Sequence, residues 1–116
     1  MVSGDRADAD WAKVVADLRS YGLPEATANA DLLEIAGQKW AGLVVPRTSM
    51  ASLLFTRLDD PFPFPVEVRV RWSQGTFEFR LERGVLLVTA DRCRQPNAPA
   101  VLDSFLMQVA SLPEPG

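Results

Sequence analysis

The stretch that decides the fold runs from Val66 to Ala90 and contains three segments: VEVRVRW (66–72), TFEFRLE (76–82) and VLLVTA (85–90). Successive residues of a strand point to opposite faces, so pairing must place apolar residues on the same side. The alternation, together with the turn residues between the segments, predicts a three-stranded antiparallel meander.

The two connections set the register that we expect. A connection of two or four residues around Ser73, Gln74 and Gly75, with Gly75 at positive φ, keeps the apolar residues of the first hairpin on one face. A two-residue Arg83-Gly84 turn would do the same for the second hairpin. The expected apolar pairs are Val66 with Leu81, Val68 with Phe79, Val70 with Phe77, Leu81 with Leu86, Phe79 with Val88 and Phe77 with Ala90.

Two helices are expected before the meander. The first starts near Asp8 or Asp10 as N-cap and ends before Gly22, and its apolar stripe is Trp11, Val14, Val15 and Leu18. The second is expected from Pro24 to Trp40, with proline at an allowed first-turn position. Two alternatives stay open: an earlier end at Gly37, and a short strand at 32–35.

The segments on either side of the meander are less regular. We expect a buried strand at 41–45, and at 48–60 a strand is favoured over a helix, because it would cover an open sheet edge. The run DDPFPFP (59–65) predicts an extended connector, since proline excludes helix at the preceding residue. A polar link at 91–96 leads to a last helix capped by Asn97 and ended by Pro113, with an apolar stripe of Leu102, Phe105, Leu106 and Val109.

These elements assemble into one α+β domain over residues 1–116, with flexible tails at 1–6 and 113–116. The expected architecture is an antiparallel meander of four or five strands, with the N-terminal helices and the C-terminal helix packed on one face as a two-layer sandwich. We expect the first and last helices to cover an apolar sheet face led by Val68, Val70, Phe77, Phe79, Leu81 and Val88.

Composition restricts the classes of partner and compartment. No apolar run approaches the roughly 20 residues that cross a bilayer, no signal-peptide core is present, and a lone cysteine forms no internal disulfide. We therefore expect a cytoplasmic protein.

The net charge of −3 and the pI near 4.8 argue against nucleic-acid or membrane partners. Ten arginines against two lysines suggest a GC-rich and bacterial coding sequence.

The sequence carries no catalytic constellation. The chain has no histidine, which is the commonest general base and metal ligand, and its glycines form no phosphate-binding loop. Cys93 lies between Arg92 and Arg94, which would lower a thiol pKa, and Asp59 and Asp60 are adjacent carboxylates. Both are more typical of structural positions, so we expect no enzyme, cofactor or metal site.

Three features are candidates for contact with another protein. The first is the pair Phe62 and Phe64, held in the stiff proline connector. The second is the other face of the sheet, where Arg69, Arg71 and Arg80 alternate with glutamates and Leu87 lies beyond them. The third is Trp40 between Gly37 and Gly42, which is also typical of a core residue.

By elimination, the sequence favours a small protein that binds another protein, such as an immunity protein or a secretion chaperone or adaptor. A homodimer through a sheet edge or the outer face is a second way to use these residues. The alternative is a small-molecule or lipid-binding domain with an apolar pocket beside Phe77, Phe79 and Trp11.

Overall fold

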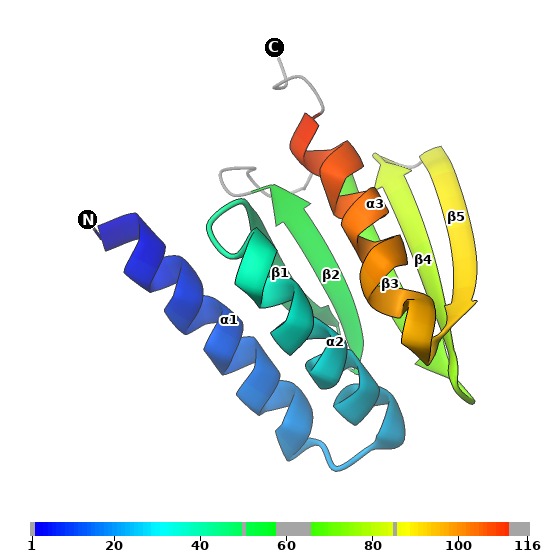
Figure 1. Cartoon of the computed structure of the whole chain (residues 1–116), viewed down its shortest axis with the longest axis horizontal. Helices are drawn as coiled ribbons and strands as arrows, with labels where there is room; N and C mark the ends of the chain where they lie inside the picture. The colour runs from blue at the N-terminus through cyan, green and yellow to red at the C-terminus, as the bar shows by residue number, and fades with distance from the viewer. Residues whose placement is uncertain (1, 50, 58–65, 85, 112–116) are drawn as a thin grey trace.

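The computed structural model describes residues 2–49, 51–57, 66–84 and 86–111. Five strands form one antiparallel sheet in the order β1-β2-β3-β4-β5, so the predicted α+β meander is confirmed (Figure 1). In chain order the elements are α1 (Val2–Ser20), α2 (Pro24–Trp40), β1 (Val44–Ser49), β2 (Ser52–Arg57), β3 (Val66–Ser73), β4 (Thr76–Arg83), β5 (Leu86–Arg94), a 3-10 turn (Gln95–Asn97) and α3 (Ala98–Ser111).

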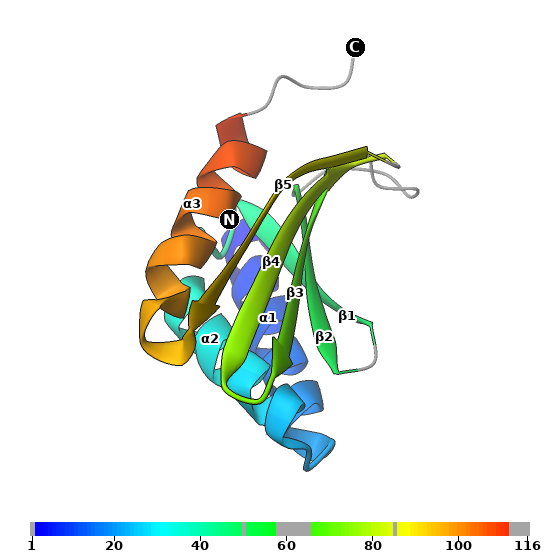
Figure 2. The same ribbon diagram turned by 90° about the vertical axis from the view of Figure 1, so that its right-hand side faces the viewer.

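The described helices all lie on one face of the sheet, which gives two layers (Figure 2). α2 packs against β2 and β3, and α3 packs against β2 to β5. α1 packs on α2 and meets the sheet mainly at β1, with Trp11 also contacting Phe55 of β2, so the expectation that the first helix covers the sheet is right only at this edge. α2 takes the central place because small residues let it approach both α1 and the sheet; its buried alanines are Ala26, Ala28, Ala30 and Ala36.

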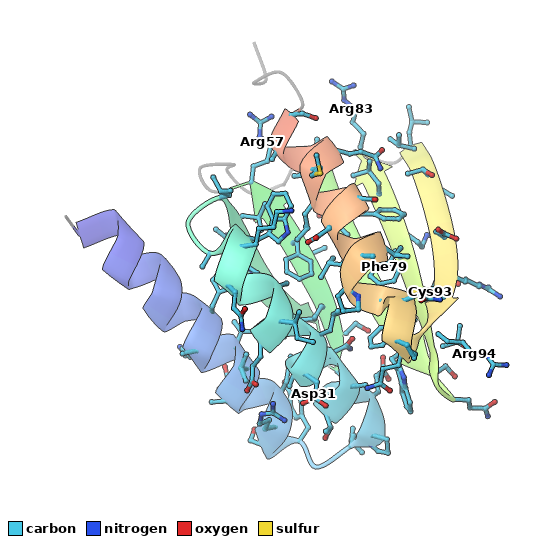
Figure 3. All side chains as sticks on the ribbon, viewed as in Figure 1. Asp31, Arg57, Phe79, Arg83, Cys93 and Arg94 are labelled. Atoms are coloured by element: carbon cyan, nitrogen blue, oxygen red, sulfur yellow. The ribbon has the colours of Figure 1, made fainter. Side chains whose placement is uncertain are left out.

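The core lies between the sheet and the helices, and aromatic rings fill its centre. Phe79 lies between Phe77 and Phe105, with ring centroids 6.0 and 5.7 Å apart, and Figure 3 labels it beneath α3. Trp11 of α1 contacts Phe55 of β2 at 5.9 Å. Five of the six residues that we expected to lead the apolar face are buried: Val68, Val70, Phe77, Phe79 and Leu81.

The predicted limits of a helix or strand agree best with the structure where the sequence contains a strong start or stop residue. α2 has the predicted limits, with Pro24 in its first turn. The structure has neither a break at Gly37 nor a strand at 32–35.

α1 begins earlier than the expected Asp8 or Asp10, since it already includes Val2. The first strand begins at Val44 instead of residue 41, because Gly42 turns the chain at φ +91. The favoured strand within 48–60 is confirmed by β2, where Leu53 and Phe55 face the core.

The first hairpin keeps the predicted faces but not the predicted pairs. Val68 lies opposite Leu81 and Val70 opposite Phe79, which moves every pair by two residues from expectation. The cause is the position of the two-residue connection, which consists of Gln74 and Gly75, both at positive φ, 52° and 84°. Positive φ at both central residues defines the type I′ turn, whose twist matches that of the flanking strands.

The second hairpin departs further from the prediction. Arg83 lies opposite Leu86, and a bulge at Leu81/Glu82 shifts the register so that Phe79 lies opposite Asp91, not Val88. A one-residue slip exchanges the two faces of a strand. The polar residues in the later part of β5 therefore lie beside the core, and the apolar residues at its start lie outside the core. The pairs that we expected for Leu86, Val88 and Ala90 are therefore wrong, and so is the place of Val88 on the apolar face. The expected polar link at 91–96 is also wrong in part, because β5 continues to Arg94.

Candidate protein-binding surface

No described helix covers the second face of the sheet, which we call the outer face (Figure 2). The register places one continuous row across it, in which Arg47, Leu54, Arg69, Arg80 and Ala90 lie side by side. Among the described strand residues, the outer face carries six arginines and three glutamates: Arg47, Arg69, Arg71, Arg80, Arg92, Arg94, Glu67, Glu78 and Glu82. It is therefore a net positive surface on a negatively charged protein.

Ion pairs with glutamates hold several arginines of the outer face in place. Arg69 lies 3.4 Å from Glu67 and 3.6 Å from Glu82, and Arg80 lies 3.5 Å from the same Glu82. These guanidinium groups are only partly exposed, and the Nε atom of Arg80 is buried without a hydrogen-bond partner. A network of this kind holds long side chains in defined positions, and each exposed pair contributes only a few tenths of a kcal/mol to folding.

Two arginines of the outer face, Arg71 and Arg94, form no ion pair with a described acid. Arg71 lies opposite Glu78 in the register, but Glu78 accepts from Arg92, whose Nη2 is 2.9 Å away. Among the described residues no acid pairs with Arg71, and its side chain is exposed. An unneutralised guanidinium is the part of this surface that is free to bind an acidic group.

The apolar part of the surface lies at the free edge of the sheet. β5 has no strand partner beyond β4 within the described chain, and its first three residues are consecutive and exposed: Leu86 (68%), Leu87 (50%) and Val88 (54%). Leu87 lies opposite Glu82 and hence on the outer face, where a shallow hollow of about 390 Å³ separates it from Arg80 and Arg92. An apolar edge rimmed by arginine has the composition of a protein interface.

The other candidate residues from the sequence fall elsewhere. Trp40 is buried at 4% exposure and its indole Nε1 donates to Asp103 at 2.7 Å, so it is a core residue that joins α2 to α3. Phe62, Phe64, Asp59 and Asp60 lie outside the described residues, as does Pro113. Phe77, Phe79 and Trp11, which we considered as the lining of an apolar pocket, are packed against other rings.

Cys93 does not have the environment of a reactive thiol. Partial burial raises its pKa, and the nearby carboxylate of Asp91 raises it further. The two neighbouring arginines have little influence, because strand alternation turns Arg92 and Arg94 to the opposite face from Cys93. The thiol is therefore protonated at neutral pH, contrary to what the Arg-Cys-Arg sequence suggests.

Comparison of the chain with models of known protein families, with curated proteins and with solved structures finds no match. Within the described residues, no three side chains of the metal-binding types gather in one place. None of the described helices is long and apolar enough to cross a membrane.

Proposed function

We propose that this protein is a non-enzymatic module that binds another protein through the outer face and the free edge formed by β5. The observation that carries the proposal is the exposure of Leu86, Leu87 and Val88 on β5, an edge strand with no partner beyond β4 among the described residues. Such an edge offers backbone donors and acceptors to an incoming strand, and soluble proteins usually protect it with charges, proline or a covering element. An unprotected apolar edge next to arginines is suited to binding.

Charge favours the same class of partner. The outer face is net positive, whereas the helical layer carries acids such as Asp17, Asp31 and Glu34. A partner with an acidic rim around an apolar centre complements the outer face, and such complementarity mainly increases the rate of association and its specificity. Immunity proteins and secretion chaperones or adaptors are the roles that we propose, in the cytoplasm, where a lone free cysteine is ordinary.

The test is affinity purification of the tagged protein from the organism that encodes it. The decisive variant is Leu87→Glu, which puts a charge into the apolar edge without touching the core. The matched control is Thr27→Glu, at an exposed position on α2. We expect a stoichiometric partner with the natural protein and with the control, and its loss with Leu87→Glu. A partner retained by Leu87→Glu would contradict the proposed surface.

Self-association through β5 is the second candidate, because an open edge also pairs with a second copy. Light scattering at two protein concentrations separates the two. A mass that doubles with concentration, and that Leu87→Glu returns to one chain, would identify a homodimer in place of a different partner.

A further inference from the structure

A slot opens inside the sheet between β2 and β3, at the end opposite the Gly84 turn. The two strands pair only from Leu53 with Val70 to Phe55 with Val68. Continuing this register would place Ala51 opposite Trp72, but Ala51 lies in a turn and pairs with no residue of β3. The carbonyl oxygen of Ala51 instead accepts a hydrogen bond of 2.7 Å from the buried Asn29 of α2, which draws the connection toward the helical layer.

The backbone of Trp72 faces this slot. Ser73 and Thr76 close a two-residue turn, and in such a hairpin the closing residues exchange hydrogen bonds with each other. Because hydrogen-bonding direction alternates along a strand, the amide and carbonyl of Trp72 then point away from β4 and toward the missing strand. A single residue of an extended chain is the natural partner for one such donor and one such acceptor.

The walls of the slot differ in chemistry. It is a hollow of about 860 Å³, and its lining includes Tyr21 and Leu23 from the α1–α2 turn, Leu53, Arg69, Arg71 and Trp72. Arg71 and Arg69 belong to the outer face, whereas Leu53 and Trp72 belong to the core face. The slot therefore has a cationic wall on one side of the sheet and a largely apolar wall on the other.

Two polar groups at the slot lack partners. Arg71 has no acidic partner among the described residues, since Glu78 is held by Arg92. The indole Nε1 of Trp72 is buried without a hydrogen bond, whereas the indoles of Trp11 and Trp40 donate to the Val44 carbonyl and to Asp103. The guanidinium of Arg71 lies on the outer-face wall and the indole of Trp72 on the core-face wall, so a negatively charged group of a ligand would bind at the outer-face wall.

We infer that the slot binds an extended peptide segment of a partner in which an acidic residue is flanked by apolar residues. The segment pairs with the backbone of Trp72 and directs its carboxylate to Arg71. Because side chains alternate along a strand, its apolar neighbours then point to Leu53, Tyr21 and Leu23. Glu25, which accepts from Ser52 Oγ at 3.4 Å on that side, disfavours a second acid there.

This inference adds a second contact site to the proposed function and is tested separately from it. The experiment is an NMR titration of the nitrogen-labelled full chain with the acetylated and amidated peptide Thr-Val-Glu-Val-Thr, up to millimolar concentration. We expect the indole and backbone amide resonances of Trp72 to move, while the indole resonances of Trp11 and Trp40 stay in place. The peptide Thr-Val-Lys-Val-Thr should bind about tenfold more weakly or not at all.

Reversing the charge of Arg71 tests whether this residue binds the acidic residue of the peptide. With Arg71→Glu, the preference should reverse, so that the lysine peptide moves the Trp72 resonances and the glutamate peptide does not. Arg83→Glu changes an exposed arginine at the far end of β4, and it should behave as the natural protein does (Figure 3). Equal effects of the two peptides, or no movement at Trp72, would overturn the inference. An equal effect of N-acetylglutamate alone would replace the peptide with a small carboxylic acid.

Discussion

At the residue scale, burial separates structural tryptophans from candidate contact residues. Trp40 was ambiguous in the sequence, because a tryptophan between glycines fits both a surface anchor and a core. The structure shows that Trp40 is a core residue, because its indole donates a hydrogen bond to Asp103, which lies 63 positions away in the sequence. Sequence spacing contains no information on a contact of that kind, so the role of Trp40 could not be predicted locally.

Trp40→Phe keeps most of the ring volume and removes this hydrogen bond. We expect the free energy of unfolding to fall by about 1–2 kcal/mol, because Asp103 loses a donor at a partly buried position. Urea denaturation followed by circular dichroism measures the change. Lys39→Gln is the matched control: it removes the exposed ion pair to the same carboxylate at 3.6 Å and the contact of Lys39 Nζ over the Trp40 ring at 5.3 Å, and it should cost less than about 1 kcal/mol. An equal loss in both variants would contradict this account of Trp40.

The pKa of Cys93 gives a prediction about reactivity and pH. Because burial and Asp91 raise that pKa, alkylation by iodoacetamide near pH 8 should be slower than for a cysteine in an unfolded peptide. The folded state holds the thiol proton more tightly, so this group's contribution to stability is complete below the unfolded-state pKa. It falls as pH rises toward the higher folded-state pKa. An alkylation rate that rises at lower pH than in the peptide would contradict this direction.

At the element scale, the strand faces were predictable and the exact pairs were not. The period-two pattern of residues 66–72 and 76–82 fixes which side of β3 and β4 is buried. Residues 85–88 are apolar without interruption, so no alternation indicates which side of β5 faces the core. The bulge at Leu81/Glu82 determines which side of β5 faces the core, and the sequence pattern does not predict this bulge.

The exposure of Val88 distinguishes the observed register from the one that we expected. Val88→Ala should change the free energy of unfolding by less than about 0.5 kcal/mol, because the side chain is more than half exposed. Val70→Ala, at a fully buried position on β3, should cost about 2 kcal/mol. Chemical denaturation of the two variants side by side is the measurement, and comparable losses would show that Val88 packs in the core.

The type I′ turn at Gln74 and Gly75 predicts a stabilising substitution. Gln74 holds φ at 52°, a region that asparagine occupies more readily than glutamine, and Asn-Gly is a preferred type I′ pair. We expect Gln74→Asn to raise the free energy of unfolding by about 0.5 kcal/mol. Gly75→Ala should lower it by about 1 kcal/mol through backbone strain alone, since an added Cβ meets no atom within 4 Å. A loss with Gln74→Asn would argue against this turn.

At the scale of the whole molecule, the described helices all lie on one face of the sheet, and no described helix covers the other. The class of fold could be predicted because five strands and three helices each carry a local signal. The outer positions of Arg69, Arg71 and Arg80 followed from alternation alone. The slot at Trp72 could not be predicted, because it depends on Asn29 holding the Ala51 carbonyl across 22 residues.

The central claim is that the outer face and the β5 edge contact another protein, and site-specific photo-crosslinking in living cells tests it most directly. A benzophenone amino acid is placed at Leu87, and separately at Thr27 on the helical layer, where it serves as the control. We expect one discrete crosslinked partner, formed from Leu87 and not from Thr27. A crosslink from Thr27 alone, or none from Leu87 under conditions where the protein is folded and abundant, would contradict it.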